Sequence, residues 1–334
     1  MYRFIRFFLF LLNPELAHHI SMKGLKLACF FGLIRTKKEL SKPVTIMGLK
    51  FPNKVGLAAG LDKNAEYIIP LSKLGFGFIE VGTVTPRSQP GNNKPRSFRL
   101  IEDRGIINRF GFNNVGIDQF IKNIKKSNFK GVLGVNIGKN FDTPINKAVE
   151  DYLICFRKAY RYAGYIAINV SSPNTKNLRN LQSDKYLETL LKALKKEQKI
   201  LYKKIKKIVP FVVKISPDNS NQQLDSIAKL LLKYKVDGVI ATNTTIDRKK
   251  ILASKYVNEL GGLSGAPLNK KSTNVIKHLN KSLKGRIPII GVGGIMTADD
   301  GVEKMKNGAS LIQIYSGLIF RGHRLVNELC KAIR

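Results

Sequence analysis

The chain has 334 residues, 43% of them hydrophobic, which excludes a disordered or fibrous protein and allows one large buried core. The formal net charge is +35, yet the excess is mostly lysine spread over surface helices without interleaved aromatic residues, so we expect no nucleic-acid partner. Three scattered cysteines, Cys29, Cys155 and Cys330, exclude a disulfide framework and have no metal-binding spacing, which indicates a reducing cytosol and no metal site.

The N-terminal segment, residues 1–40, is apolar with basic flanks and begins MYRFIRFFLFLLNPELAHHI. Its uninterrupted apolar run, Phe7 to Leu12, is far shorter than the roughly 18 to 20 residues that span a bilayer, and no small-residue cleavage site follows it. Pro14 and Glu15 suit the first turn of a second helix. Two short apolar helices of this kind favour a membrane interface, and the alternative is that they cap the core of the main domain.

Eight apolar, strand-like runs separated by helix-length segments follow residue 42. Before the first run, VTIMGLKFPNKVGL alternates around Pro52 and Asn53, which predicts a short hairpin with its turn at these residues. Eight βα units predict an α/β fold, a closed (β/α)8 TIM barrel, with a doubly wound open sheet as the alternative. The predicted strands cover residues 55–60, 78–85, 131–138, 165–172, 211–217, 238–244, 288–295 and 311–317.

Polar residues gather at the carboxyl ends of these runs, where barrels carry their sites. Alternation along the strands turns Asn136 and Lys214 towards the barrel interior. Since a buried lysine is costly without an anion, and no nearby strand residue is expected to supply a carboxylate, we favour a bound anionic ligand over a structural ion pair. The glycine-rich ends of the last two strands, GVGGI and YSG, suit a phosphate group.

Nine motifs extend from the first strand to the last: AAGLDKN (58–64), GTVTPRSQPGN (82–92), NRFGFNN (108–114), VNIGKN (135–140), INVSSPNT (168–175), ATNTT (241–245), GGLSGAPL (261–268), IGVGGI (290–295) and IYSG (314–317). With these motifs the chain resembles the dihydroorotate dehydrogenases of the membrane-associated, quinone-reducing class. The resemblance implies oxidation of dihydroorotate to orotate in pyrimidine (UMP) biosynthesis. It also implies one FMN per chain and a membrane quinone as electron acceptor.

The resemblance also implies the residues of the site. The residues expected to bind FMN are Ala59, Gly60, Leu61, Asp62, Lys63, Thr83, Asn136, Asn169, Lys214, Thr242, Gly265, Gly294, Tyr315 and Ser316. The residues expected to bind the substrate are Lys63, Asn108, Arg109, Phe110, Gly111, Phe112, Asn169, Asn174, Asn243 and Thr244. Their chemistry agrees, because asparagines offer both a donor and an acceptor to a pyrimidine, while Lys63 suits its carboxylate and Lys214 the charge that develops on a flavin.

Ser172 lies where this family has the base that takes a proton from carbon 5 of the substrate. A serine is a poor base alone, so its help must come from a hydrogen-bonding or water path and from the surrounding Asn and Lys groups. Soluble relatives that use fumarate or NAD have cysteine at this position, so the serine indicates the quinone class. Cys155 lies upstream of this loop and is expected in the core.

The predicted organisation is an N-terminal membrane and quinone-access segment, residues 1–40, followed by an FMN-binding barrel, residues 41–334. We expect a peripheral protein, monomeric, on the cytoplasmic face of the inner membrane. One alternative is an FMN barrel that reduces uridine in transfer RNA, which would suit the charge but would be expected to carry a catalytic cysteine and an RNA-binding extension. The other is a noncatalytic membrane-binding barrel, which would be colourless when purified.

Overall fold

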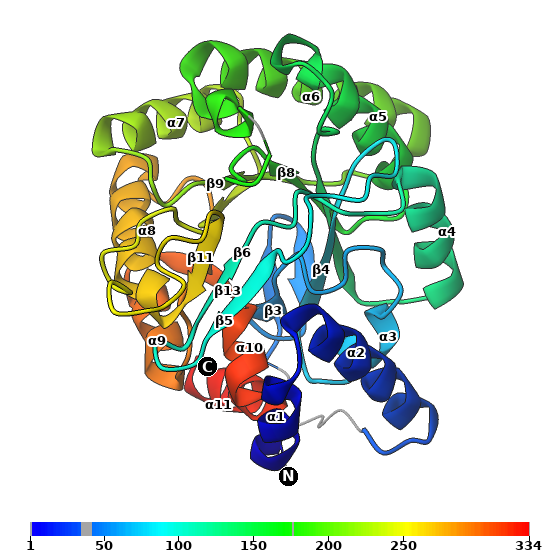
Figure 1. Ribbon diagram of the computed structural model, residues 1–334. Helices are drawn as coiled ribbons and strands as arrows, with labels where there is room; N and C mark the ends of the chain where they lie inside the picture. Colours follow the sequence, from blue (N-terminus) through cyan, green and yellow to red (C-terminus); the bar gives the residue numbers. More distant parts are fainter. Residues whose placement is uncertain (1, 35–41, 176, 334) are drawn as a thin grey trace.

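The computed structural model describes residues 2–34, 42–175 and 177–333, and its central feature is a closed barrel of eight parallel strands (Figure 1). The strands follow one another around the barrel in chain order, which confirms the predicted (β/α)8 fold. Several end earlier than predicted: residues 242–244, for example, leave the sheet and line the mouth of the barrel. The barrel strands are β3 (Val55–Leu57), β4 (Phe78–Val84), β7 (Val132–Ile137), β8 (Tyr165–Asn169), β9 (Phe211–Ile215), β10 (Gly238–Ala241), β12 (Ile289–Val292) and β13 (Ala309–Ile314).

Amphipathic helices cover the outside of the barrel (Figure 1). In α6, Leu187, Leu190, Leu191 and Leu194 recur every three or four residues and are buried, while lysines occupy the opposite face. The helices α7 and α9 each begin with a capping box, in which the N-cap side chain and the side chain three residues later bond each other's backbone N–H. These caps limit fraying at the helix ends nearest the site. The outer helices are α3 (Ile68–Ser72), α4 (Ile117–Ser127), α5 (Ala148–Tyr160), α6 (Asp184–Ile205), α7 (Asn221–Lys233), α8 (Asn269–Leu283), α9 (Ala298–Lys306), α10 (Ser316–Arg321) and α11 (His323–Ala332).

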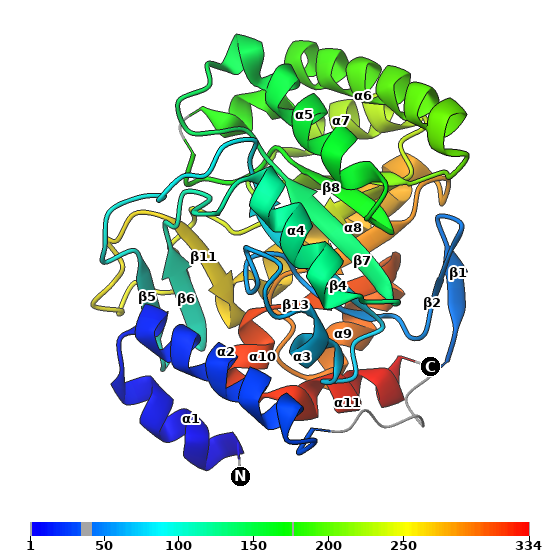
Figure 2. The ribbon, with the colours of Figure 1, turned by 90° about the vertical axis from the view of Figure 1, so that its right-hand side faces the viewer.

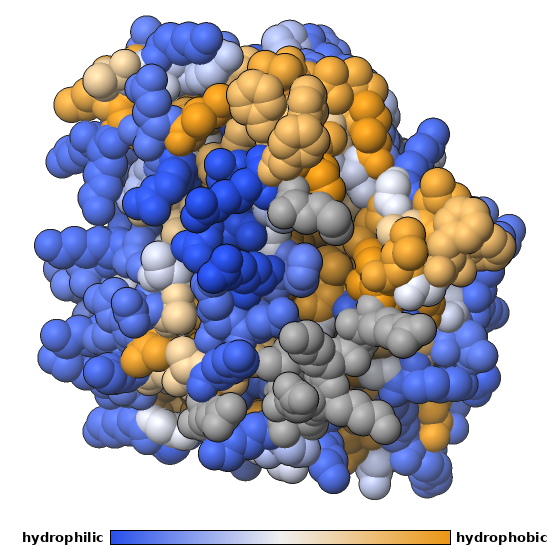
Figure 3. All heavy atoms as spheres, turned by 90° about the horizontal axis from the view of Figure 1, so that it is seen from below, coloured by the Kyte–Doolittle hydropathy of each residue, from blue (hydrophilic) through white to orange (hydrophobic). Residues whose placement is uncertain are grey.

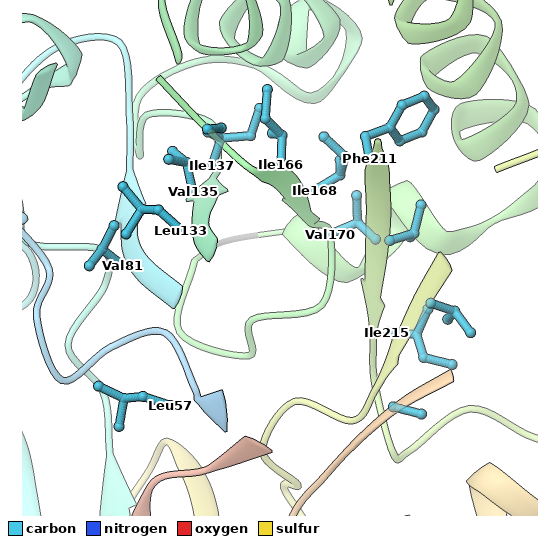
Figure 4. Close-up of a cluster of buried hydrophobic side chains, with 14 of the residues drawn as sticks. Leu57, Val81, Leu133, Val135, Ile137, Ile166, Ile168, Val170, Phe211 and Ile215 are labelled. Carbon is cyan, nitrogen blue, oxygen red and sulfur yellow. The ribbon is translucent and has the colours of Figure 1, made fainter. Parts of the chain in front are cut away.

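The main core lies between the strands and these helices (Figure 4). Val135 and Ile137 of β7 and Ile166 and Ile168 of β8 lie on the side of their strands that faces the helices, and all four are fully buried. Because side chains alternate along a strand, the residues between them point into the barrel. This alternation is what delivers Asn136 to the interior, as predicted.

A short hairpin closes the amino-terminal end of the barrel, far from the mouth (Figure 2). Its strands are β1 (Val44–Ile46) and β2 (Leu49–Phe51), and buried Phe51 packs against Phe78 with ring centroids 5.2 Å apart. The predicted turn at Pro52 and Asn53 is wrong, because the chain reverses at Met47 and Gly48, both at positive φ. Asn53 instead connects β2 to β3, accepting the Val55 N–H and donating to the Gly75 carbonyl, each at 3.0 Å.

A second, three-stranded antiparallel sheet, which we did not predict, stands at the mouth of the barrel (Figure 2). It comprises β5 (Ser97–Leu100), β6 (Gly105–Asn108) and β11 (Gly262–Gly265), in the order β11-β6-β5. Its strands are only four residues long and come from two loops more than 150 residues apart, so neither loop reads as a sheet on its own. The pairing holds Asn108 opposite Gly262 at the mouth.

Two helices precede the barrel, α1 (Tyr2–Leu11) and α2 (Pro14–Phe30), as the sequence predicts. The Asn13 side chain caps α2 by accepting the Glu15 N–H at 3.0 Å. None of the helices in the described part of the chain has the length and apolar character needed to cross a membrane. The predicted domain boundary at residue 40 lies outside the described residues and stays a prediction.

The two N-terminal helices attach to the barrel through a few polar contacts. Arg6 donates to the Phe320 carbonyl at 2.7 Å, and Arg96 of the mouth loop pairs with Glu15 at 2.8 Å. None of the residues of α1 is buried, and α2 buries only Ala17 and Met22. Most of their apolar surface therefore faces outwards.

Candidate active site

A pocket opens over the carboxyl ends of the barrel strands, beneath the mouth sheet. The hollow measures about 1000 Å³ including the solvent at its entrance. Most of the predicted site residues line it: Ala59, Gly60, Lys63, Thr83, Asn108, Phe110, Gly111, Phe112, Asn169, Ser172, Asn174, Lys214, Thr242, Asn243, Thr244, Gly265, Gly294, Tyr315 and Ser316. Residues far apart in sequence therefore meet at one place because every strand ends there.

Four predicted residues lie outside this lining. Leu61 and Asp62 are buried beside it, and the Asp62 carboxylate accepts the N–H groups of Glu66 and Tyr67. Asn136 lies one layer deeper in the barrel, and Arg109 points away to pair with Glu259 at 2.5 Å. For these residues a supporting role fits the geometry better than direct contact with a ligand.

The floor of the pocket is a chain of hydrogen-bonded amides. Asn136 Oδ1 accepts from Thr83 Oγ1 at 2.6 Å and from Asn169 Nδ2 at 3.2 Å. Asn169 Oδ1 in turn accepts from Asn243 Nδ2 at 3.1 Å. Because these groups hold one another, their side chains are positioned before any ligand binds.

Glu80 of β4 is a buried carboxylate inside the barrel, which corrects the expectation that no strand residue supplies one. Its Oε1 accepts from Asn136 at 2.8 Å, and its Oε2 accepts from Tyr165 and Gln313, each at 2.7 Å. The sequence carries a signal for it, since Glu80 is two residues after Phe78 in FIEVGTV and therefore lies on the same, inward-facing side of the strand. Within the described ranges, Glu80 and Lys214 nevertheless form no ion pair.

Lys214 of β9 is a buried lysine that lines the pocket. Burial lowers its pKa, and the charge of Glu80 opposes this effect. Across residues 2–34, 42–175 and 177–333, no hydrogen-bond acceptor meets its ammonium group. A buried cation of this kind favours an anionic ligand in the pocket, as predicted from the sequence.

Lys63 provides a second positive charge at the entrance. Its Nζ donates to the Gly60 carbonyl at 2.8 Å and lies 4.1 Å from the centre of the Phe110 ring. Burial and the nearby Arg96 lower its pKa to about 8, against the opposing charges of Glu15 and Asp62. The Lys63 ammonium group is therefore mostly protonated at neutral pH and loses its charge when the pH rises above about 8.

Two buried acceptors in the lining find no donor among the residues that the structure describes. Asn174 Oδ1 and Gln313 Oε1 are both inaccessible to solvent and have no hydrogen-bond partner within those residues. The Asn174 amide is held from its other side, where Nδ2 donates to Asn108 Oδ1 at 3.2 Å. An unpaired buried acceptor is costly, so these atoms are suited to ligand N–H groups.

Glycines in the loop after β12 bring bare backbone to the pocket. Gly293 and Gly294 both have positive φ, and a Cβ on Gly294 would lie 2.3 Å from the backbone nitrogen of Asn269. Beside them, Ser316 Oγ donates to Ser264 Oγ at 2.9 Å. This corner, between the last two strands, has the backbone amides and hydroxyls that a phosphate requires.

Ser172 lies in the loop after β8, buried at the edge of the pocket. Its Oγ accepts the Asn174 N–H at 3.2 Å. Sequence reasoning missed Arg179, which fixes this loop by donating to the Ser171 carbonyl at 3.2 Å, to Asp218 at 2.9 Å and to the Thr244 carbonyl at 3.0 Å. Its side chain comes from a short 3-10 helix, η3 (Leu178–Gln182), rather than a strand end, so strand alternation gives no signal for it.

Cys155 lies in α5 and is fully buried in the main core, as predicted. Burial raises its pKa well above the usual thiol range, which makes it unreactive. Among the described residues, no group of His, Cys, Asp and Glu is placed to hold a metal ion.

A closed (β/α)8 barrel with a preorganised polar pocket at the carboxyl ends of its strands defines an enzyme of the barrel class. The sequence model described as Dihydroorotate dehydrogenase matches residues 41–334. The chain therefore belongs to the dihydroorotate dehydrogenase family, which confirms the resemblance.

Relatives and solved structures agree with this membership. The chain is 55% identical to a protein named dihydroorotate dehydrogenase (quinone) from Nitrosospira multiformis, over 100% of this chain and 96% of that protein. It is 56% identical to a protein of the same name from Psychromonas ingrahamii, over 99% of each chain. A structure of this enzyme from Eimeria tenella in complex with ferulenol has a TM-score of 0.88 at 38% identity, covering 96% of this chain and 90% of that one.

Proposed function

We propose that the protein oxidises dihydroorotate to orotate in pyrimidine biosynthesis and delivers the electrons to a quinone. The observation that carries this proposal is the pocket, which joins unpaired amide acceptors, two lysines and a glycine-lined corner in a chain of this family. Its relatives over the full length are named as the quinone-dependent enzyme. Neither alternative, a transfer-RNA uridine reductase or a noncatalytic membrane protein, has comparable support.

We propose FMN, one per chain, as the resident cofactor. The residues fit this group: the glycine corner with Tyr315 and Ser316 suits its phosphate, and Lys214 with the amide floor suits its ring. The residues proposed to hold it are Ala59, Gly60, Lys63, Thr83, Asn169, Lys214, Thr242, Gly265, Gly294, Tyr315 and Ser316, with Leu61, Asp62 and Asn136 in support. When bound, FMN accepts a hydride from the substrate and passes electrons to the quinone.

The substrate is proposed to bind above the floor, under the mouth sheet. Asn108, Asn174 and Asn243 present both donors and acceptors, which match the imide edge of a pyrimidine. Lys63 meets the substrate carboxylate, since its ammonium has one hydrogen-bond acceptor among the described residues and lies at the entrance. Asn169, Thr244 and the stretch 108–112 complete the proposed site, with Arg109 holding that stretch through Glu259.

Ser172 is the proposed base. Its oxygen receives the proton that leaves carbon 5 and its own hydroxyl proton passes on along a hydrogen-bonding or water path, while the hydrogen on carbon 6 leaves as hydride for the flavin and a double bond forms between carbons 5 and 6. Its buried position limits competing water, and the Asn174 N–H fixes its oxygen. The two lysines and the surrounding amides stabilise the charge that develops during the reaction.

The N-terminal helices are proposed to face the membrane and admit the quinone. Phe4, Phe7 and Leu11 of α1 are 70%, 62% and 71% exposed, and Phe30 of α2 is 81% exposed. Seen from below, apolar side chains gather in patches over this face (Figure 3). The position of α2 supports an approach to the site, since half-buried His18 lies near enough to Lys63 to feel its charge: partial burial first, and then the charges of Lys63 and His19, lower the pKa of His18 to about 3. A peripheral, monomeric protein at the cytoplasmic face of the inner membrane would suit this arrangement.

Anaerobic mixing with dihydroorotate tests the proposal. The purified protein should be yellow with flavin absorbance, which dihydroorotate should bleach, and a quinone analogue should restore the colour faster than fumarate or NAD. A colourless protein, or a flavin that dihydroorotate leaves oxidised, would contradict the proposed function. Faster reoxidation by fumarate or NAD would contradict the quinone class alone.

A further inference from the structure

Glu80 is a fully buried carboxylate that the proposed mechanism leaves without a role. It lies inside the barrel one layer below the pocket, among Asn136, Tyr165 and Gln313. Burial of a carboxylate costs several kcal/mol of folding free energy unless it is compensated. Placing this group at the centre of the barrel therefore lowers the stability that the fold would otherwise have. Its three neutral donors satisfy the oxygens without cancelling the charge.

The carboxylate determines the direction of every amide above it. Since an ionised carboxylate only accepts hydrogen bonds, Asn136 must turn its NH₂ group down to Glu80 and its oxygen up. That oxygen then receives Thr83 and Asn169, so Asn169 presents its own oxygen to Asn243. Asn243 Oδ1 is left to accept the Thr244 N–H at 2.9 Å. One carboxylate thus sets a single donor direction from the barrel interior to the pocket.

Glu80 also acts on Lys214 through space. The two residues lie on different strands of the same barrel, and the negative charge of Glu80 raises the pKa of Lys214 against the effect of burial. Lys214 stays free to meet the ligand, because the contacts of Glu80 are taken by neutral groups. The pocket floor therefore contains a separated pair of opposite charges rather than a closed ion pair.

We propose that Glu80 is a positioning residue that orders the amide floor and offsets the positive charge of Lys214, and so lowers the reduction potential of the bound flavin. The proposal rests on the proposed function, because it needs FMN in the pocket. A negative charge below the site makes added electrons less stable, whereas Lys214 makes them more stable. The reduction potential of the bound flavin therefore depends on both charges, and both side chains lie inside the barrel.

Glu80→Gln tests the charge while keeping the shape of the side chain. We expect the midpoint potential of the bound flavin to rise by about 30 mV or more, which is a tenfold shift in a two-electron equilibrium. The measurement is a spectroscopic redox titration of the purified flavoprotein against a reference dye. An unchanged potential in a variant with full flavin content would overturn the proposal.

Tyr165→Phe is a matched control of the opposite sign. It removes one O–H dipole that screens Glu80 and leaves the hydrogen bond from Asn136 in place, so the field of the carboxylate at the pocket is stronger and the potential should fall. A fall in this variant also keeps the idea testable if Glu80→Gln does not fold. A shift in the same direction for both variants would indicate general loosening of the barrel and overturn the proposal. Absence of flavin from the parent protein would instead contradict the proposed function.

Discussion

At the scale of single residues, Ser172 carries the clearest prediction. Ser172→Ala should keep FMN bound, because the one side-chain hydrogen bond of Ser172 among the described residues is to the Asn174 N–H and Ser172 is not among the residues proposed to hold FMN. Flavin reduction by dihydroorotate should slow by about 10²- to 10⁴-fold, the usual contribution of a positioned base. Stopped-flow absorbance of the anaerobic enzyme measures the rate. Near-parental reduction would remove Ser172 from the proposed role.

Lys63 predicts how ligand affinity depends on pH. Its pKa is lowered to about 8, so its ammonium form predominates below that pH and is lost above it. Since an anionic ligand needs the ammonium form, the affinity for orotate should be flat up to about pH 7.5 and fall towards tenfold per pH unit above 8. Titration of the flavin spectrum with orotate at each pH gives the dissociation constant.

Lys63→Arg is the matched control for this pH profile. Arginine stays protonated throughout the series, so the decline above pH 8 should disappear even if the affinity is lower overall. A variant that retains the same decline would show that another group titrates. Lys63 would then not be the group that meets the carboxylate.

At the scale of elements, Arg179 joins the loop after β8 to the loops after β9 and β10. Arg179→Lys keeps a charge near Asp218 but loses the fork that reaches the Ser171 and Thr244 carbonyls. With the loop less fixed, we expect flavin reduction by dihydroorotate to slow about tenfold, the cost of roughly one such hydrogen bond. Flavin content should not change.

Arg87→Lys provides the comparison for Arg179. Arg87 pairs with Asp142 on the surface, where both side chains are 63% exposed, and such pairs contribute little. Its reduction rate should match the parent. If both lysine variants slowed the reaction equally, the effect would not belong to the Arg179 contacts.

At the scale of the whole molecule, two approaches to one site are proposed, one from water at the barrel mouth and one from lipid along α1 and α2. Replacing Phe4, Phe7 and Leu11 together by serine should leave the fold intact, because α1 buries none of them. Reduction by dihydroorotate should be unchanged, while reoxidation by a long-chain quinone and binding to anionic vesicles both decline. Stopped-flow traces and vesicle co-sedimentation measure these effects.

Exposed apolar residues elsewhere on the molecule test whether any loss of hydrophobic surface reduces quinone turnover and vesicle binding. Ile200 and Ile208, at the carboxyl end of α6 and just beyond it, are 50% and 64% exposed. Their replacement by serine should change neither quinone turnover nor vesicle binding. Parental quinone turnover in the α1 variant would contradict the role of α1 and leave it a structural cap.

Much of the fold could be predicted because strand periodicity is a local property. Alternation alone places Asn136 and Lys214 inside the barrel, and the eight runs of apolar residues indicate the closed sheet. The sequence predicts the turn of the first hairpin at the wrong place, because Pro52 and Asn53 have stronger turn preferences than Met47 and Gly48 do. Local preference ranked the two sites in the wrong order, and the packing of Phe51 under the barrel decided the register.

The sequence by itself determined the barrel class, the core strands and the gathering of polar residues at the strand ends, since each depends on neighbours along the chain. Tertiary structure alone decided three features: the mouth sheet, the contacts of Arg179 and the partners of Glu80. Each joins segments that lie far apart in the chain, as when Gln313 of the last strand donates to Glu80 of the second. The physical reason is that a buried charge is tolerated only when hydrogen-bond partners surround it. Closure of the barrel decides which residues from distant parts of the chain become those partners.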